Sequence, residues 1–590
     1  MATVGIDIGT GSVRVCYHDA VNGIFESYDE PITTYNVNDD IISQSSNEIF
    51  RNILKLLNKL NHKDYVAVST AATCSMVVTE IQEIITSNEY IVESFHLPTT
   101  IGSQSNIFDI FLWMDNKATK ETNELNQSLP SSILNRVGKK LVPELGIPKL
   151  KYLQSIYPDK KFIVFEFYDW IHNLLSTSIG SKRIVTLNPQ SYADDSYALD
   201  GSIKGWSSST LKDLFHIDNI QVGGFQQDRF GIENHSLLPW GYPVGQLSTE
   251  VKQTIGISKD HEVIIANGCI DCYAGWLSTI VNPDDFNNGI CTMVAGTSTC
   301  FLYPGLSKAN DVFVDGIWGP FKISDDIHMY EFGQPATGKL FERLFQNYEK
   351  TIRKIVDVND SKLVFDYIET EIQKYEVKYH KSINQMIKNY FYYGDVFGNR
   401  SPLNDFSMSE MIIDGMNSES IDEAFKSISI ISDESSDERI IQSLIIKYNL
   451  ILEFLCFQTK QMIDGFHTSG VNPIKKLVMV GSQSHNKRFV ELLSNILQLP
   501  IITLDKEDKK YDVVKGASIM ARVGVELYQD KELEYGEGLQ KILSEHKIHT
   551  ANIRETIPSD KDRRLLEVKY EIFIDMCNRQ QKYRDMMRAV

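Results

Sequence analysis

One stretch near the start of the chain decides its fold: Thr3-Val4-Gly5-Ile6-Asp7-Ile8-Gly9-Thr10-Gly11-Ser12-Val13-Arg14-Val15-Cys16-Tyr17. Apolar and polar residues alternate on both sides of a Gly-Thr-Gly-Ser break, which predicts a β-hairpin. Glycines let a backbone approach an anion closely, and hydroxyl and N–H groups donate to phosphate oxygens. Asp7, at the end of the incoming strand, can hold Mg²⁺ through water. Many hairpins contain such a turn, so this motif alone leaves phosphate binding and plain structure both open.

The next residues alternate between helical and strand patterns. Ser45 and Glu48 form a capping box, and apolar residues then recur at helical spacing as far as Leu60. The segments 65–69 and 76–79 predict strands. Strands that alternate with helices predict an α/β architecture.

A second set of the same parts lies later in the chain. The apolar segment 290–295 leads into another hydroxyl-rich glycine turn at 296–299. A strand over 477–481 then runs through a small-residue loop into a helix over 486–497. Two such turns can grip a triphosphate from both sides, and the later strand and loop are placed to receive a nucleotide base.

The repeated turns predict a duplication rather than four small domains. We expect one domain over 1–280 and a second over 281–590, separated in the loop-like stretch 282–289. An amphipathic helix over 565–587 is expected to dock against the second domain. The acidic tract 432–438 is expected to be a solvated loop, with a phosphorylation tract as the alternative.

The composition is that of an acidic protein of enzyme size. The 590 residues include 59 Lys and Arg against 78 Asp and Glu, a formal net charge of −19. Nucleic acid and anionic membranes bind clustered Lys and Arg, so the sequence predicts neither as a partner. Membrane spans and a secretory signal are not expected, and eight cysteines fit a cytoplasmic protein. A homo-oligomer is compatible with the sequence.

Two motifs resemble known sites but lack part of the pattern. The segment 333–340 has the glycine and lysine spacing of a Walker A loop, but Leu340 replaces the Ser or Thr that binds magnesium, and Pro335 removes an N–H donor. Cys269 and Cys272 form a C-x-x-C without the second pair that completes a zinc site. We therefore expect packed thiols beside Asp271.

Longer motifs resemble the FGGY family of carbohydrate kinases, in the superfamily of actin, hexokinase and the sugar kinases. Gly268-Cys269-Ile270-Asp271-Cys272-Tyr273-Ala274-Gly275 resembles the family's G-x-x-D-x-x-A-G segment, whose aspartate is the catalytic base. The resemblance covers residues 4–587, and its pentulose-kinase branch is indicated by the runs 72–75, 293–300, 317–321, 398–402 and 570–587.

The resemblance implies an α/β fold of two duplicated actin/hexokinase-like (ribonuclease H-like) domains with a cleft between them. It also implies ATP and Mg²⁺ as cofactors and a small sugar as substrate. Asp271 is expected to be the catalytic base, with a loop cap as its structural alternative, and Asp7 to hold Mg²⁺ through water. The residues expected around ATP are Thr10, Gly11, Ser12, Arg14, Gly296, Thr297, Ser298, Gly481, Ser482 and Asn486. Those expected at the sugar are Thr73, Cys74, Ser75, Trp113 and Asp115, the last with a helix N-cap as its alternative.

Most departures from the ribulokinase pattern lie on the sugar side. Ala71 stands where an aspartate is usual, and Asn116 and Lys117 stand where His-Arg is usual. The segment 186–190 stands where a Cys-Lys-Trp run is usual, and it contains no lysine. Pro335 stands where the family has a serine, and Ser482 stands where it has a glycine.

The residues expected to carry phosphoryl transfer are intact, namely Asp7, Thr10, Asp271 and Thr297. The sequence therefore predicts ATP-dependent phosphorylation of the terminal hydroxyl of a ketopentose, with D-ribulose giving D-ribulose 5-phosphate. Two alternatives stay open: a kinase for another ketose or polyol, and a non-catalytic sugar or nucleotide sensor.

Overall fold

The computed structural model forms two compact units, each assembled from three stretches of chain. Unit 1 comprises Met1–Thr292, Leu302–Glu331 and Lys506–Asn552, and unit 2 comprises Met293–Phe301, Phe332–Asp505 and Ile553–Val590. The structure describes residues 1–99, 106–177, 182–186, 203–204, 206, 208–225, 238–280, 288–306, 312–323, 327–357, 360–415, 422–431, 436–504, 512–545, 553–588 and 590. Most of the predicted loop 282–289, the segment 187–190 and the first part of the acidic tract lie outside these residues. The division into domains at residue 280 stays a prediction.

Unit 1 is built on a six-stranded sheet with the order β12-β13-β5-β1-β2-β3. These strands are β1 (Thr3–Ile8), β2 (Ser12–Asp19), β3 (Ile24–Pro31), β5 (Ala67–Ala72), β12 (Pro243–Gln246) and β13 (Ile264–Ile270). β1 pairs antiparallel with β2 and parallel with β5, which in turn pairs parallel with β13. The predicted hairpin is confirmed, and its register places Asp7 directly opposite Arg14.

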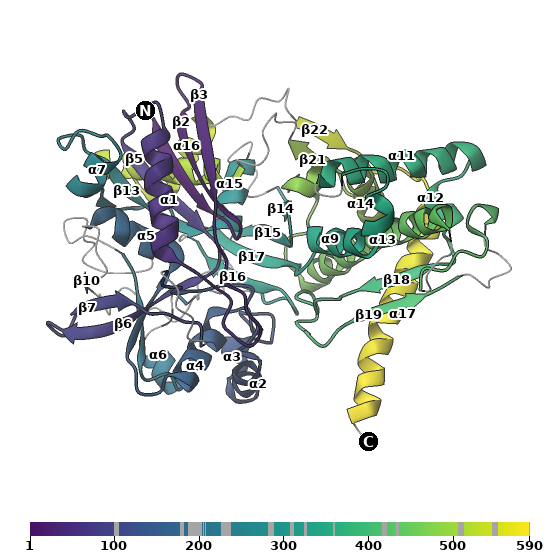
Figure 1. Ribbon diagram of the computed structural model, residues 1–590, viewed down its shortest axis with the longest axis horizontal. Helices are drawn as coiled ribbons and strands as arrows, with labels where there is room; N and C mark the ends of the chain where they lie inside the picture. The colour runs from purple at the N-terminus through teal and green to yellow at the C-terminus, as the bar shows by residue number, and fades with distance from the viewer. Residues whose placement is uncertain are drawn as a thin grey trace. The chain divides into compact units, whose positions relative to one another are not determined.

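Helices cover both faces of this sheet, because its central strands are apolar on both sides. One face packs on α15 (Asp512–Gln529), where a Cβ on Gly5 would lie 2.0 Å from the carbonyl oxygen of Val514. The other face carries α1 (Ser46–Lys59) and α5 (Phe167–Ser176) (Figure 1). α8 (Asp271–Thr279) follows β13 without a loop and packs against α15. The end of β13 therefore has a fixed position in unit 1.

The predicted start of α1 is confirmed. The Ser45 hydroxyl accepts a hydrogen bond from the Glu48 N–H at 3.4 Å, and the helix buries Ile49, Phe50 and Ile53. The Glu48 carboxylate accepts from the Thr33 N–H instead of returning to the N-cap, so half of the capping box forms.

A second sheet of unit 1 has the order β10-β7-β6-β8-β4, with β9 paired to β6 and β11 paired to β9. Its strands are β4 (Ser43–Gln44), β6 (Met76–Ile84), β7 (Glu89–Ser94), β8 (Ile110–Phe111), β9 (Phe162–Glu166), β10 (Lys182–Thr186) and β11 (Ile220–Gly223). The remaining elements of unit 1 are α2 (Thr119–Ser128), α3 (Ser131–Leu134), α4 (Gly146–Ile156), α6 (Ser208–Asp213), α7 (Thr249–Thr254), α16 (Tyr535–Glu545) and β16 (Trp318–Lys322). Strands thus alternate with helices, which confirms the predicted α/β class.

Three strands contribute residues to both units: β14 (Ile290–Ala295), β15 (Thr299–Leu306) and β17 (Ile327–Gln334). In unit 2, β20 (Lys476–Val480) pairs parallel with β21 (Ile501–Leu504), and β21 pairs antiparallel with β22 (Ile553–Thr556). β18 (Phe391–Gly394) and β19 (Glu410–Ile413) form a separate antiparallel pair. The helices of unit 2 are α9 (Gly338–Asn347), α10 (Glu349–Ile352), α11 (Ser361–Tyr379), α12 (Ile383–Met386), α13 (Asp437–Ser469), α14 (Lys487–Leu497) and α17 (Arg563–Arg588), with 3₁₀ turns η4 (Glu423–Phe425) and η5 (Ser482–His485).

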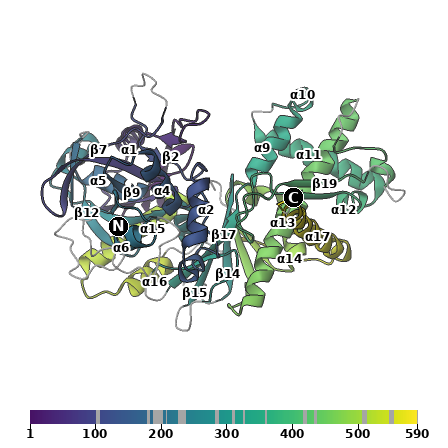
Figure 2. The ribbon, with the colours of Figure 1, turned by 90° about the horizontal axis from the view of Figure 1, so that it is seen from below.

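α13 is the central helix of unit 2 and packs against α9, α14 and α17 (Figure 2). By length and composition alone it could cross a membrane, but 78% of its apolar window is buried, as in the core helix of a soluble protein. The buried Lys569 ammonium lies 2.5 Å from the buried Glu453 carboxylate and joins α17 to α13. The predicted C-terminal helix is confirmed. It buries Leu566, Phe573, Met576 and Cys577, whereas Tyr583 and Met587 near its end are exposed.

Candidate active site

The hairpin of unit 1 places a carboxylate and a guanidinium side by side. The Arg14 guanidinium donates to the Asp7 carboxylate at 2.7 Å, and Asp7 is 1% exposed. Burial raises the pKa of Asp7, while the charge and hydrogen bond of Arg14 oppose that rise. Both residues come from the cross-strand pair that the hairpin register sets, so their contact follows directly from the sequence pattern.

Asp271 is the first residue of α8 and stands at the end of β13. Burial raises its pKa to about 7, and the nearby negative charges of Asp7 and Glu331 add to the rise. The Cys272 N–H and the charge of Arg14 act in the opposite direction. Asp271 nevertheless keeps a partly exposed surface, so a bound molecule can reach it. A carboxyl group with a pKa near neutrality can both accept and release a proton under physiological conditions.

Four predicted residues of unit 1 form one hydrogen-bonded group. The Trp113 indole N–H donates to the Thr10 hydroxyl at 3.0 Å, and the Trp113 backbone N–H donates to the Ser75 hydroxyl at 3.1 Å. The Thr73 and Ser75 hydroxyls lie 2.9 Å apart. The glycine turn and three of the predicted sugar residues therefore lie together in unit 1. Cys74, between Thr73 and Ser75, is partly exposed.

The Asp115 carboxylate holds backbone groups. One oxygen accepts from the Ile42 N–H at 2.8 Å, and the other accepts from the Lys117 N–H at 2.9 Å. The side chain is fully buried. Asp115 is not the helix N-cap of its structural alternative, because Ala118 is the N-cap of α2. Its contacts fix the loop that carries Trp113, and a sugar contact through Asp115 stays a prediction.

The remaining residues of the first turn support the backbone. The Gly11 carbonyl accepts from the Ile32 N–H at 3.1 Å, and the Ser12 carbonyl accepts from the Gly9 N–H at 3.0 Å. The turn is therefore closed by its own backbone bonds and is tied to the end of β3.

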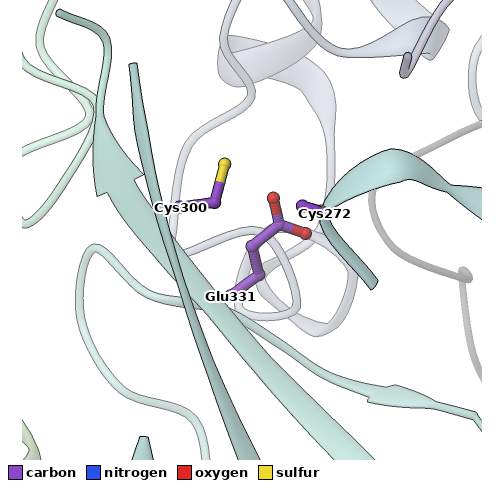
Figure 3. Close-up of side chains that lie close together, drawn as sticks. All are labelled: Cys272, Cys300 and Glu331. Carbon is purple, nitrogen blue, oxygen red and sulfur yellow. The ribbon is translucent and has the colours of Figure 1, made fainter. Parts of the chain in front are cut away.

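Glu331, on β17, is an acidic residue near Asp271 that the sequence motifs did not single out. Its carboxylate accepts from the Tyr273 hydroxyl at 2.6 Å and is 8% exposed. Figure 3 shows this carboxylate extending toward Cys272, and the ligand atoms of the two residues lie within 4.8 Å of each other.

In unit 2 the second glycine turn rests on the start of α9. The N–H groups of Thr337 and Lys339 donate to the Thr297 carbonyl at 2.8 and 3.2 Å, and that of Gly338 donates to the Gly296 carbonyl at 3.0 Å. A Cβ on Gly338 would lie 2.8 Å from the Gly296 oxygen. Three backbone donors of the Walker-like segment are thus already used. These three N–H groups therefore donate to the turn of 296–297 rather than toward a phosphate.

A pocket of about 510 Å³ opens beside this turn, and all of its lining belongs to unit 2. The predicted residues Gly296, Thr297 and Ser482 line it. The rest of the lining is Gly338, Lys339, Phe341, Glu342, Phe345, Gln346, Glu349, Ser361, Phe365 and Gln483. The pocket therefore combines a hydroxyl-rich turn with three phenylalanine rings, which suits a ligand with an anionic end and a flat apolar ring.

Three other residues of unit 2 that were predicted around the nucleotide lie outside this lining. Gly481 has φ +88°, and a Cβ there would lie 2.4 Å from the Ala295 carbonyl oxygen, so only glycine lets β20 run this close to β14. The Asn486 side chain caps α14 by accepting from the Phe489 N–H at 3.1 Å. The Ser298 carbonyl accepts from the Gly296 N–H at 2.9 Å and closes the turn. Their contacts are structural, and a nucleotide contact stays a prediction for each.

The chain is similar to known proteins over its whole length. The model of the FGGY family of carbohydrate kinases, C-terminal domain, matches residues 291–523. Protein MPA43 of Saccharomyces cerevisiae is 30% identical over 100% of this chain and 98% of its own length. A D-ribulokinase of the same yeast is 28% identical over 85% of this chain and 68% of its own length.

Solved structures show the same fold. The ligand-bound xylulose kinase from Lactobacillus acidophilus has a TM-score of 0.65 and 13% sequence identity, covering 98% of each chain. At this identity the likeness concerns the fold alone. It confirms the predicted α/β class with the actin/hexokinase-like fold of the sugar kinases.

Proposed function

The chain belongs to the FGGY family of carbohydrate kinases, and from this premise we propose that it transfers the γ-phosphoryl group of ATP to the terminal hydroxyl of a ketopentose. D-Ribulose is the proposed sugar and D-ribulose 5-phosphate the proposed product. The observation that carries the proposal is Asp271, a partly exposed carboxyl group whose pKa of about 7 suits a general base.

The proposed transfer begins at the sugar hydroxyl. Asp271 accepts the proton of the sugar hydroxyl while that oxygen forms a bond to the γ-phosphorus and the bond from the γ-phosphorus to the β-phosphate oxygen breaks, so that ADP leaves. Phosphoryl transfer depends mainly on positioning and on neutralising charge. The residues proposed to hold the phosphates are Thr10, Arg14, Gly296 and Thr297.

Mg²⁺ would be held by Asp7 through water. The acidic residues present fit this ion, because Mg²⁺ prefers carboxylate oxygens and water. Asp7 lies close enough to Asp271 for its charge to raise the pKa of Asp271. The Arg14 guanidinium offsets part of their negative charge. When bound, Mg²⁺ neutralises phosphate charge. The protein's own contribution is to keep Asp7 oriented through the bond from Arg14.

The choice of D-ribulose is supported by the similarity to a yeast D-ribulokinase over 85% of this chain. The changes at Ala71, Asn116 and Lys117 motivate the alternative of a non-catalytic sensor, because a sugar pocket that has lost its usual residues is what loss of activity would leave. Asp271 argues against a non-catalytic sensor, because a protein that binds sugar or nucleotide without turnover needs no general base.

The test is ADP release from the purified protein with ATP, Mg²⁺ and a panel of pentuloses, pentoses and polyols. Release that depends on D-ribulose supports the proposal. Release with another sugar alone would replace the substrate, and ATP binding without release for any sugar would support a sensor.

The phenylalanine-lined pocket gives a prediction for the nucleotide site. Phe345 is partly exposed in the pocket, and its ring centroid lies 5.1 Å from that of Phe365. If the adenine ring stacks there, Phe345→Ala should raise the KM for ATP about 10- to 100-fold, the range for loss of one base–aromatic stack. The KM for the sugar should stay within about twofold, since the sugar residues belong to unit 1. Steady-state kinetics measure both.

The matched control is Phe25→Ala, which removes another partly exposed phenylalanine, on β3 of unit 1 and outside the pocket. It should leave the KM for ATP unchanged. An unchanged KM for ATP in Phe345→Ala would place the adenine elsewhere.

A further inference from the structure

The loop that carries Trp113 closes a ring of hydrogen bonds with the first glycine turn. Trp113 donates through its indole N–H to the Thr10 hydroxyl at 3.0 Å. Two residues further on, Asp115 accepts from the Ile42 N–H at 2.8 Å. Two residues beyond Ile42, the Gln44 amide donates to the Thr10 carbonyl at 2.7 Å. The proposed sugar loop and phosphate turn are thus tied together at both ends.

Lys149 contacts the backbone of the loop that carries Trp113 and belongs to none of the motifs that indicated function. It comes from α4 and is 1% exposed. Its ammonium donates to the carbonyl oxygens of Leu112 and Trp113, at 2.9 and 2.6 Å. A buried ammonium is costly unless several acceptors surround it, and these two carbonyls turn the loop backbone toward α4.

The charges around Lys149 belong to the same region. Burial lowers its pKa to about 8, while the nearby Cys74, Asp115 and Glu144 oppose that change. Cys74 and Asp115 are two of the residues predicted at the sugar. The Lys149 ammonium therefore lies close to two residues predicted at the sugar.

We propose that Lys149 is a positioning residue for the sugar: it holds the Trp113 loop so that the indole both meets the sugar and anchors Thr10 of the phosphate turn. This inference rests on the proposed function of the loop as the sugar-binding segment. Lys149 acts through the Leu112 and Trp113 carbonyls and does not touch the substrate. Sugar binding and the shape of the phosphate turn are coupled through the Trp113 indole.

The test compares Lys149→Met with Lys151→Met. Lys151 lies on the same helix, and its ammonium donates to the Phe215 carbonyl at 3.1 Å, away from the Trp113 loop. Lys149→Met should raise the KM for the sugar about tenfold or more, as expected for loss of hydrogen bonds from a charged donor. Its kcat should change less than its KM. Lys151→Met should change neither.

A double-mutant cycle with Trp113→Phe tests the coupling. Trp113→Phe keeps an aromatic ring and removes the donor to Thr10. If both residues act through one loop, the double variant should raise the KM for the sugar about as much as the stronger single variant, because coupled sites are not additive. Additive effects, or an unchanged KM in Lys149→Met, would overturn the proposal.

Hydrogen exchange separates this proposal from the proposed activity. The backbone amides of 112–117 should exchange faster in Lys149→Met than in wild type or in Lys151→Met, whatever the substrate. Unchanged exchange in a folded Lys149→Met protein would refute the positioning role. Fast exchange together with no turnover of any sugar by wild type would refute the proposed function and leave the role of Lys149 in the loop intact.

Discussion

Asp271→Asn should lower kcat by about 10²- to 10⁴-fold, which is the usual range for removal of a general base. The affinity for ATP should stay nearly unchanged. Asparagine keeps the shape of the side chain and cannot accept the proton at neutral pH. Asp271 belongs to unit 1, whereas the pocket proposed for adenosine is lined by unit 2, so the two properties should separate. Sugar-dependent ADP release and calorimetric titration with ATP measure them.

Thermal unfolding supplies the control for Asp271→Asn. The pKa of Asp271 is raised in the folded protein, to about 7, above its ordinary unfolded value of about 4. The folded state therefore binds more protons between these values, and the carboxyl group costs stability increasingly as pH rises from about 4 to 7. The variant should unfold at a temperature at least as high as wild type at pH 8. If the variant folds and keeps most of its turnover, Asp271 is not the general base.

Turnover should fall steeply in acid. A base with a pKa of about 7 is ionised above that pH and protonated below it, so kcat/KM should level off above pH 7 and decline about tenfold for each pH unit below it. The profile of kcat/KM reports the free enzyme and is the measurement to make. Because Asp7 and Asp271 interact, the midpoint belongs to the coupled pair rather than to one residue.

Glu331→Gln tests the cause of this midpoint. Glu331 is one of the two negative charges that raise the pKa of Asp271, so its removal should move the midpoint of kcat/KM to lower pH. Tyr273→Phe is the matched control, because it removes the hydroxyl bonded to Glu331 and keeps the charge. A midpoint that stays in place in Glu331→Gln, or a flat profile down to pH 5 in wild type, would contradict this assignment.

The elements that the sequence predicted well are those with a local cause. The hairpin, the cap of α1, the strand β14 and the helices α14 and α17 depend on alternation, helical spacing or a capping residue within one segment. The register of this hairpin places Asp7 opposite Arg14. The α/β class followed from the order of these elements.

Two residues near the candidate site were not indicated by their own segments. Lys149 contacts the carbonyl oxygen of Trp113, and the charge of Glu331 raises the pKa of Asp271, both across a long stretch of chain. Asp115 shows the opposite case, because its motif pointed to the sugar while its oxygens hold the Ile42 and Lys117 N–H groups. The role of a buried carboxylate depends on the hydrogen-bond donors around it, and the sequence does not show which donors these are.

The sequence by itself determined the family, the hairpin turn with Asp7 and Thr10, and Asp271 as the residue that follows a buried strand. These depend on patterns within short segments. Only the tertiary structure decided that the pKa of Asp271 lies near 7 and that Lys149 holds the Trp113 loop. The physical reason is that a pKa and a loop position depend on burial and on charges brought together from distant segments, which no single segment specifies.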